Sequence, residues 1–274
     1  MNDLAAAPKP ETPDPTEALH AELDQVDRAL LDLFARRLRL AEGVNLLNQG
    51  ESLKQKLHPA QEIATLRGLI AAAPDPVEPE MVVELWRAIL SANARRQGAF
   101  DVTVGGGTDP LRLFDIARRH FGARTRLKKA TDPQTALLRA VEDPNVVAVV
   151  PWPAAPGVGS WWPALSESRF HKLQLIAGLP LRGPQSEDPE ACVFARAAAE
   201  PAGDDITLMI VFDPHHRAQR ALTEVGLKGR EVARSEPRAL LRIEGFVAVE
   251  DNRAAAMTRY GLDAVRVLGS YARV

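Results

Sequence analysis

An arginine inside an apolar helical stripe is the first residue of this sequence that points to chemistry. Arg37 interrupts a series of apolar residues spaced alternately by four and three: Leu19, Leu23, Val26, Leu30, Leu33, Leu40, Val44 and Leu47. An unpaired charge in such a stripe is costly, so Arg37 requires an anion, either a ligand or a carboxylate of a second chain. The alternative is that Arg37 extends to the surface beside Arg36 and Arg39.

Two further helical segments place polar side chains where they could complete a site. Asn93 and Gln97 continue the apolar face of residues 79–97, and Glu62 lies at the edge of the stripe in the helix that opens at Pro59. A cavity lined by Arg37 and these groups suits a small polyanion with a hydroxyl group. The alternatives are that the amides reach solvent near the helix end, and that Glu62 interacts with a helix N-terminus.

Three helices must position these residues. Residues 18–98 carry three helical patterns, which predicts an all-α N-terminal domain preceded by a disordered tail over residues 1–17. The first helix would be about 45 Å long, too long for two other helices to cover. We therefore expect a homodimer in which a second copy covers the stripe.

The rest of the chain alternates strand and helix patterns. Runs such as "DVTV", "NVVAVV" and "ACVFARA" alternate with helical runs, which predicts an α/β domain over residues 99–200. Residues 205–274 then follow the order βαββαβ, which predicts a sheet with helices on one face.

Other motifs in this region favour structural roles. "VGGGTDP" predicts a tight turn before a helix rather than a phosphate loop, because it lacks the lysine that such a loop needs. The adjacent His215 and His216 indicate a surface turn rather than a metal site. Trp161 and Trp162 are expected to pack against the sheet.

Composition excludes several classes of protein. The 274 residues are 46% hydrophobic with a formal net charge of -2, which argues against nucleic acid as a partner. The single cysteine, Cys192, allows no intrachain disulfide, and no run of about 18 apolar residues is available to span a membrane. The first residues do not resemble a signal peptide. These features indicate a cytoplasmic protein that needs no metal.

The wording of the helical segments carries a family resemblance. "LDQVDRALLDLFARRLRLA", "HPAQE" and "ELWRAILSANARRQ" resemble the all-helical, intertwined-dimer class of chorismate mutases over residues 18–98. The resemblance implies conversion of chorismate to prephenate in aromatic amino-acid biosynthesis, by electrostatic positioning and without a cofactor. It implies roles for four residues: Arg37 binds one substrate carboxylate, Asn93 contacts the other, Glu62 meets the hydroxyl and Gln97 the ether oxygen.

Several cationic positions of that family are replaced. His20 stands where an arginine reaches into the neighbouring subunit's site, Asn48 replaces a lysine, and Gln61 replaces the arginine of the second helix. Lys54 or Lys56 could substitute for the missing charge, and His20 could be protonated. The alternative function is therefore a catalytically inactive homologue, a scaffold that binds a small acid or a protein.

The C-terminal part carries a weaker resemblance. "ARRHFG" and "GSWWPAL" resemble the C-terminal extension of alphaproteobacterial chorismate mutases, and "NVVAVVPWP" and "VRVLGSYARV" distantly resemble the catalytic and ACT regions of prephenate dehydratases. The dehydratase "Thr-Arg-Phe" motif falls on residues 192–194, which read Cys-Val-Phe. The effector motif falls on residues 234–237, with its charges swapped. We therefore expect neither dehydratase activity nor phenylalanine binding.

Overall fold

The computed structural model describes residues 14–47, 57–97, 100–154, 157, 159–182 and 188–274. The chain forms two compact units, residues 1–49 and residues 50–274, which we describe separately. Most of the expected tail lies outside the described residues. Helix α1 already begins at Pro15, so the last residues of the expected tail are helical.

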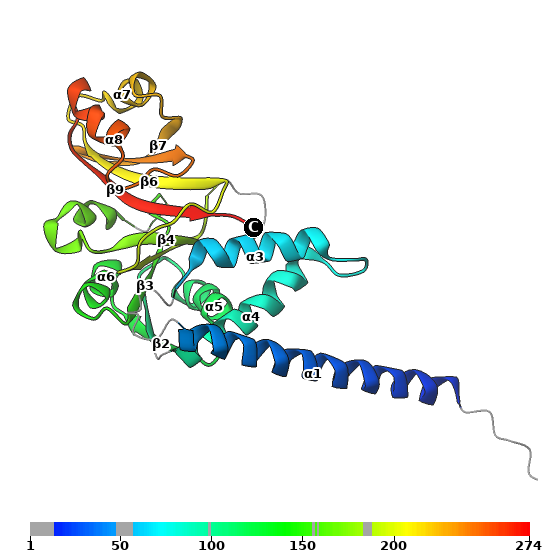
Figure 1. Cartoon of the computed structure of the whole chain (residues 1–274). Coiled ribbons are helices and arrows are strands. Elements are labelled where there is room, and N and C mark those ends of the chain that lie inside the picture. The colour runs from blue at the N-terminus through cyan, green and yellow to red at the C-terminus, as the bar shows by residue number, and fades with distance from the viewer. Residues whose placement is uncertain (1–13, 48–56, 98–99, 155–156, 158, 183–187) are drawn as a thin grey trace, which may run out of the picture. The chain divides into compact units, whose positions relative to one another are not determined.

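The first unit consists of the long helix α1 (Pro15–Leu47), which confirms the predicted helix (Figure 1). Large apolar side chains along it are exposed within the single chain: Leu19, Leu23, Val26, Leu30, Leu31, Leu33, Phe34, Leu40 and Val44. Such a row of exposed apolar groups is typical of a surface that another chain covers. The second copy itself stays a prediction.

The second unit begins with the two other predicted helices, α3 (Pro59–Ala72) and α4 (Pro79–Gln97). Proline at the first turn of α3 suits the helix start because its missing N–H has no partner there. The two helices pack on each other, and α4 packs on α5 (Pro110–Phe121). Arg67 of α3 donates to the carbonyls of Ala202 and Arg273, at 2.7 Å and 2.6 Å, and so ties this helix to the C-terminal part of the chain.

A nine-stranded sheet forms the centre of this unit, in the order β2-β1-β3-β5-β4-β9-β6-β8-β7. Its strands are β1 (Asp101–Gly105), β2 (Arg126–Ala130), β3 (Val146–Pro151), β4 (Gln174–Leu179), β5 (Ala191–Ala195), β6 (Asp205–Phe212), β7 (Gly229–Ser235), β8 (Arg238–Glu244) and β9 (Asp263–Ala272). The predicted strand runs are confirmed. The edge strand β2 was not predicted, because its sequence "RLKKA" has the charged, exposed side chains of a sheet edge.

Helices cover both faces of the sheet. One face packs against α3, α4 and α5 over strands β1 to β5, and against α7 (Ala218–Glu224) and α8 (Asn252–Ala256) over β6, β8 and β9. The opposite face packs against α6 (Pro133–Glu142) and the short helices η1 (Trp162–Ser166) and η2 (Ser168–Phe170). The C-terminal order β6-α7-β7-β8-α8-η3-β9, where η3 is Met257–Tyr260, confirms the predicted βαββαβ unit.

The βαββαβ unit shares its sheet with the preceding α/β region. Strand β9 pairs with β4 at Gly269 and Leu175. Gly269 has a φ of +123°, and a Cβ there would lie 2.4 Å from the carbonyl oxygen of Leu175. Only glycine allows this close approach, so one residue is required for the two regions to form a continuous sheet.

Candidate functional site

Arg37 lies half-buried on α1, whereas its neighbours Arg36 and Arg39 are exposed. Its Nη1 atom is buried and has no hydrogen-bond partner among the described residues. Burial lowers the pKa of Arg37, because the charged form loses hydration. The guanidinium group therefore has an unmet capacity to donate, as the anion hypothesis requires.

The other residues of the predicted site are distributed over both units. His20 is exposed on α1, and Gln61 is exposed on α3. Asn48, Lys54 and Lys56 lie outside the described residues. The backbone of Gln97 ends α4, and its side chain lies outside the described part.

Asn93 is half-buried on α4, and its Oδ1 atom is buried without a hydrogen-bond partner among the described residues. A buried amide oxygen without a donor costs free energy, so it favours a ligand or water that donates to it. Asn93 and Arg37 thus share one property, a buried polar atom that the described chain does not satisfy. They lie in different units, each described by itself.

Glu62 does not stand alone on α3 but forms an ion pair with Arg87 of α4. The side chain of Arg87 is only 7% exposed, and that of Glu62 is 21% exposed. The sequence stage missed Arg87, because the apolar face was traced through its neighbour Trp86. The spacing of Arg87, Ser91 and Ala94, all buried, is the signal that could have found it.

Arg87 also connects α4 to the end of α5. Its Nε and Nη2 atoms donate to the carbonyl oxygen of His120 at 3.0 Å and 2.8 Å, and the hydroxyl of Ser91 donates to the same oxygen at 3.1 Å. Burial and the nearby charge of Arg87 lower the pKa of His120 well below its usual value. The imidazole is therefore neutral at physiological pH.

A pocket lies beside this ion pair, where α3 and α4 meet the sheet. Apolar residues including Ile63, Leu90 and Phe121 form much of its wall. The ionisable side chains that line it are Glu62, Arg87, Glu200, Asp205 and two histidines, His58 and His120. Carboxylates therefore outnumber arginines here, which disfavours a dianion in this pocket.

The motifs judged structural are structural in the fold. Gly106 and Gly107 have φ values of +87° and +92° in the turn after β1, and Asp109 caps α5 by accepting from the N–H of Arg112. His215 and His216 lie exposed in a turn. Two further residues, Trp161 and Trp162, are buried against the sheet. Among the described residues, no group of three or more His, Cys, Asp or Glu could hold a metal ion.

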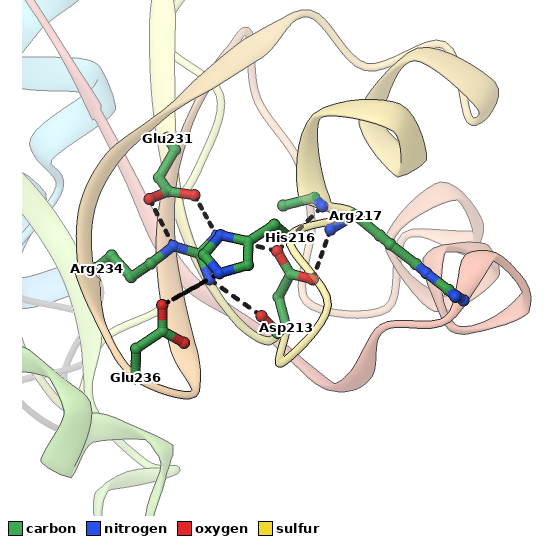
Figure 2. Close-up of polar contacts among 7 residues, drawn as sticks. Asp213, His216, Arg217, Glu231, Arg234 and Glu236 are labelled. Atoms are coloured by element: carbon green, nitrogen blue, oxygen red, sulfur yellow. Dashed lines mark hydrogen bonds and ion pairs between the residues drawn. The ribbon is translucent and has the colours of Figure 1, made fainter.

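The positions of the two dehydratase-like motifs are occupied by structural residues. Cys192 and Phe194 are buried in β5. Arg234 donates to Glu231 at 2.9 Å and to Asp213 at 3.0 Å, and lies 3.6 Å from Glu236 (Figure 2). Asp213 also accepts the N–H of Arg217 at the start of α7. The charge of Arg234 is thus neutralised by carboxylates of the fold itself.

The family model of chorismate mutase type II matches residues 19–98. These residues are a chorismate mutase type II domain. The match covers α1, α3 and α4 and therefore all the residues of the predicted site, Arg37, Glu62, Asn93 and Gln97 among them. It ends before β1, so the sheet is an addition to the chorismate mutase type II domain.

Three solved structures are similar to part of the chain, and no curated protein matches it. They are a quorum-quenching acylase, GqqA (13% identity, TM-score 0.43, 64% of this chain and 95% of that one), the prephenate dehydratase of Streptococcus mutans (13%, 0.40, 64% and 99%) and that of Arthrobacter aurescens in complex with L-Phe (17%, 0.41, 63% and 90%). At TM-scores this low we draw nothing about binding or activity from them. None of the described helices combines the length and apolar character needed to cross a membrane.

Proposed function

We propose that the chorismate mutase type II domain converts chorismate to prephenate, as a step of aromatic amino-acid biosynthesis in the cytoplasm. The observation that carries this proposal is the family match over residues 19–98, which includes the long helix with Arg37 in its apolar stripe. The rearrangement requires no nucleophile, metal or cofactor. The protein holds the substrate in a reactive shape and stabilises the charge that develops on the ether oxygen.

In this proposal, Arg37 binds one substrate carboxylate and Asn93 contacts the other. The buried unpaired Nη1 of Arg37 and Oδ1 of Asn93 support these roles, because a ligand would satisfy both atoms. Glu62 accepts the substrate hydroxyl, Gln97 donates to the ether oxygen, and His20, Asn48 and Gln61 replace the family's other cationic positions. Removing one preorganised donor at such a site typically costs about 2.7–4 kcal/mol of transition-state stabilisation.

We also propose that the active form is a homodimer. The exposed apolar side chains of α1 support it, because a second copy of the same helix is a surface of matching length and apolar character. The limits of the predicted domains, 18–98, 99–200 and 205–274, form part of the same proposal.

A second candidate, a noncatalytic scaffold, is favoured by one observation. The carboxylate of Glu62 is already held by Arg87, so part of its hydrogen-bonding capacity serves the fold. In that case the domain keeps the dimer and binds a small acid or a protein without turnover.

Substituting Arg37 separates these functions. In Arg37→Ala, the affinity for chorismate or for a bicyclic transition-state mimic is expected to fall about 100-fold or more, because a buried substrate carboxylate loses its partner. The melting temperature is expected to stay unchanged or to rise, since the substitution removes a desolvated cation. The matched control, Arg36→Ala, removes an exposed charge one residue away and should change neither quantity. A large loss of stability with unchanged affinity would make Arg37 structural and favour the scaffold.

A further inference from the structure

Four buried hydrogen-bond donors gather at one end of the sheet, outside the chorismate mutase type II domain. Trp152 follows β3, Arg242 lies near the end of β8, Tyr271 lies near the end of β9, and Arg273 follows β9. The pairing of the strands makes β3, β4, β8 and β9 run in the same direction. All four residues therefore lie toward the same edge of the sheet. We name Trp152, Arg242, Tyr271 and Arg273 the donor group.

The side chains of the donor group lie close together around Tyr271. The rings of Trp152 and Tyr271 meet edge to face, with their centroids 5.9 Å apart. Burial raises the pKa of Tyr271 to about 12, and the nearby charges of Arg242 and Arg273 oppose this rise. Both guanidinium groups thus lie near enough to act on the phenol hydroxyl.

Each member of the donor group has a buried polar atom without a hydrogen-bond partner among the described residues. These atoms are Trp152 Nε1, Arg242 Nε, Tyr271 Oη and Arg273 Nη2. Trp152 and Tyr271 are only 3% and 2% exposed, so bulk water does not satisfy them. A buried donor left unpaired costs about 1–3 kcal/mol, which makes four such donors at one place unusual in a stable fold.

The acceptors of the fold do not balance these donors. The carboxylate of Asp188 lies 3.4 Å from Arg242 Nε and 3.3 Å from Nη2 of Arg230, so two arginines share it. The thiol of Cys192 is also near, but burial raises its pKa well above the usual value, and it adds no negative charge. What the donor group lacks is therefore an acceptor, and negative charge in particular.

We propose that the donor group binds a small molecule through its carboxylate or phosphate group. Oxygen atoms of such an anion can accept from an indole N–H, a phenol O–H and two guanidinium groups, and hydrogen bonds to an ionised acceptor are the stronger kind. A cation at this place would meet two arginines and no free acceptor of the donor group. The site is separate from the proposed chorismate site, because all four residues lie outside residues 19–98.

The test uses the full-length protein and two probes, inorganic phosphate and benzoate, measured by titration calorimetry. Wild type is expected to bind at least one of them at millimolar concentration or below. Tyr271→Phe removes one hydroxyl and should weaken binding about tenfold or more, the loss of one hydrogen bond to a charged group. The matched control is Tyr260→Phe, at the other tyrosine of the chain, which packs in the core of the βαββαβ unit and should bind as wild type does.

The outcomes divide clearly. Binding of benzoate but not phosphate identifies an organic acid as the ligand class, and the reverse identifies a phosphate group. A wild type that binds neither probe at 50-fold molar excess over about 1 mM protein overturns the proposal, and so does a Tyr271→Phe variant with wild-type affinity. If Tyr271→Phe does not fold, Arg242→Gln provides the same test. Because chorismate turnover is not the readout, these results do not depend on the activity of the chorismate mutase type II domain.

Discussion

Replacing Arg87 by methionine should destabilise the second unit by about 3 kcal/mol, because it breaks a buried ion pair at one end. Removing one partner of a fully buried pair costs about 3–5 kcal/mol, and the 21% exposure of the Glu62 side chain places this pair at the lower limit. The carbonyl of His120 also loses two donors but keeps the hydroxyl of Ser91, which limits the further loss.

Urea unfolding followed by tryptophan fluorescence measures this free energy. The double variant Arg87→Met with Glu62→Leu should recover most of the loss, to within about 1 kcal/mol of wild type, because it replaces the whole pair by apolar groups. The control is Arg119→Met, which removes an exposed ion pair between α5 and Glu84 of α4 and should cost less than about 1 kcal/mol. If Arg87→Met costs as little as this control, the ion pair does not hold α3 and α4 as we describe.

Four further predictions follow from the fold. The neutral form of His120 is favoured in the folded chain, whereas the unfolded chain binds a proton below about pH 6.5; stability should therefore fall as the pH drops below 6.5, and His120→Gln should flatten that slope in pH-dependent unfolding. Gly269→Ala should lower the melting temperature strongly, since its Cβ would lie 2.4 Å from a β4 carbonyl, while Gly226→Ala, also at positive φ but in open space, should cost about 1 kcal/mol; equal effects would contradict the close approach. Asp132→Ala should cost about 1 kcal/mol in urea unfolding, because it removes the cap of α6, and a loss near zero would show that the cap is dispensable. Light scattering at micromolar concentration should give the mass of a homodimer, and a monomeric mass would refute burial of the α1 stripe by a second copy.

Periodicity and turn chemistry were enough to predict most of the helices and strands. Helix α4 has the predicted limits, and the βαββαβ order of the C-terminal unit follows from alternating apolar runs. Strand β2 could not be found in this way, because an edge strand with exposed lysines has no apolar alternation.

The contacts of the site depend on tertiary structure that periodicity does not encode. Glu62 was predicted to face the interior, but its partner Arg87 lies on another helix, and only the packing of α3 on α4 brings them together. The same holds for Trp152 and Tyr271, which are far apart in the chain and meet because β4 and β9 join two regions into one sheet. Sequence patterns locate residues on elements, whereas these pairs require the order of the strands.

The most direct test of the proposed function is the disappearance of chorismate absorbance on addition of purified protein, with the product identified by chromatography. We predict loss of chorismate well above the uncatalysed rate, formation of prephenate, and a rate in Arg37→Ala lower by a factor of about 10² to 10³. A rate in wild type equal to that of the buffer would contradict turnover by the chorismate mutase type II domain.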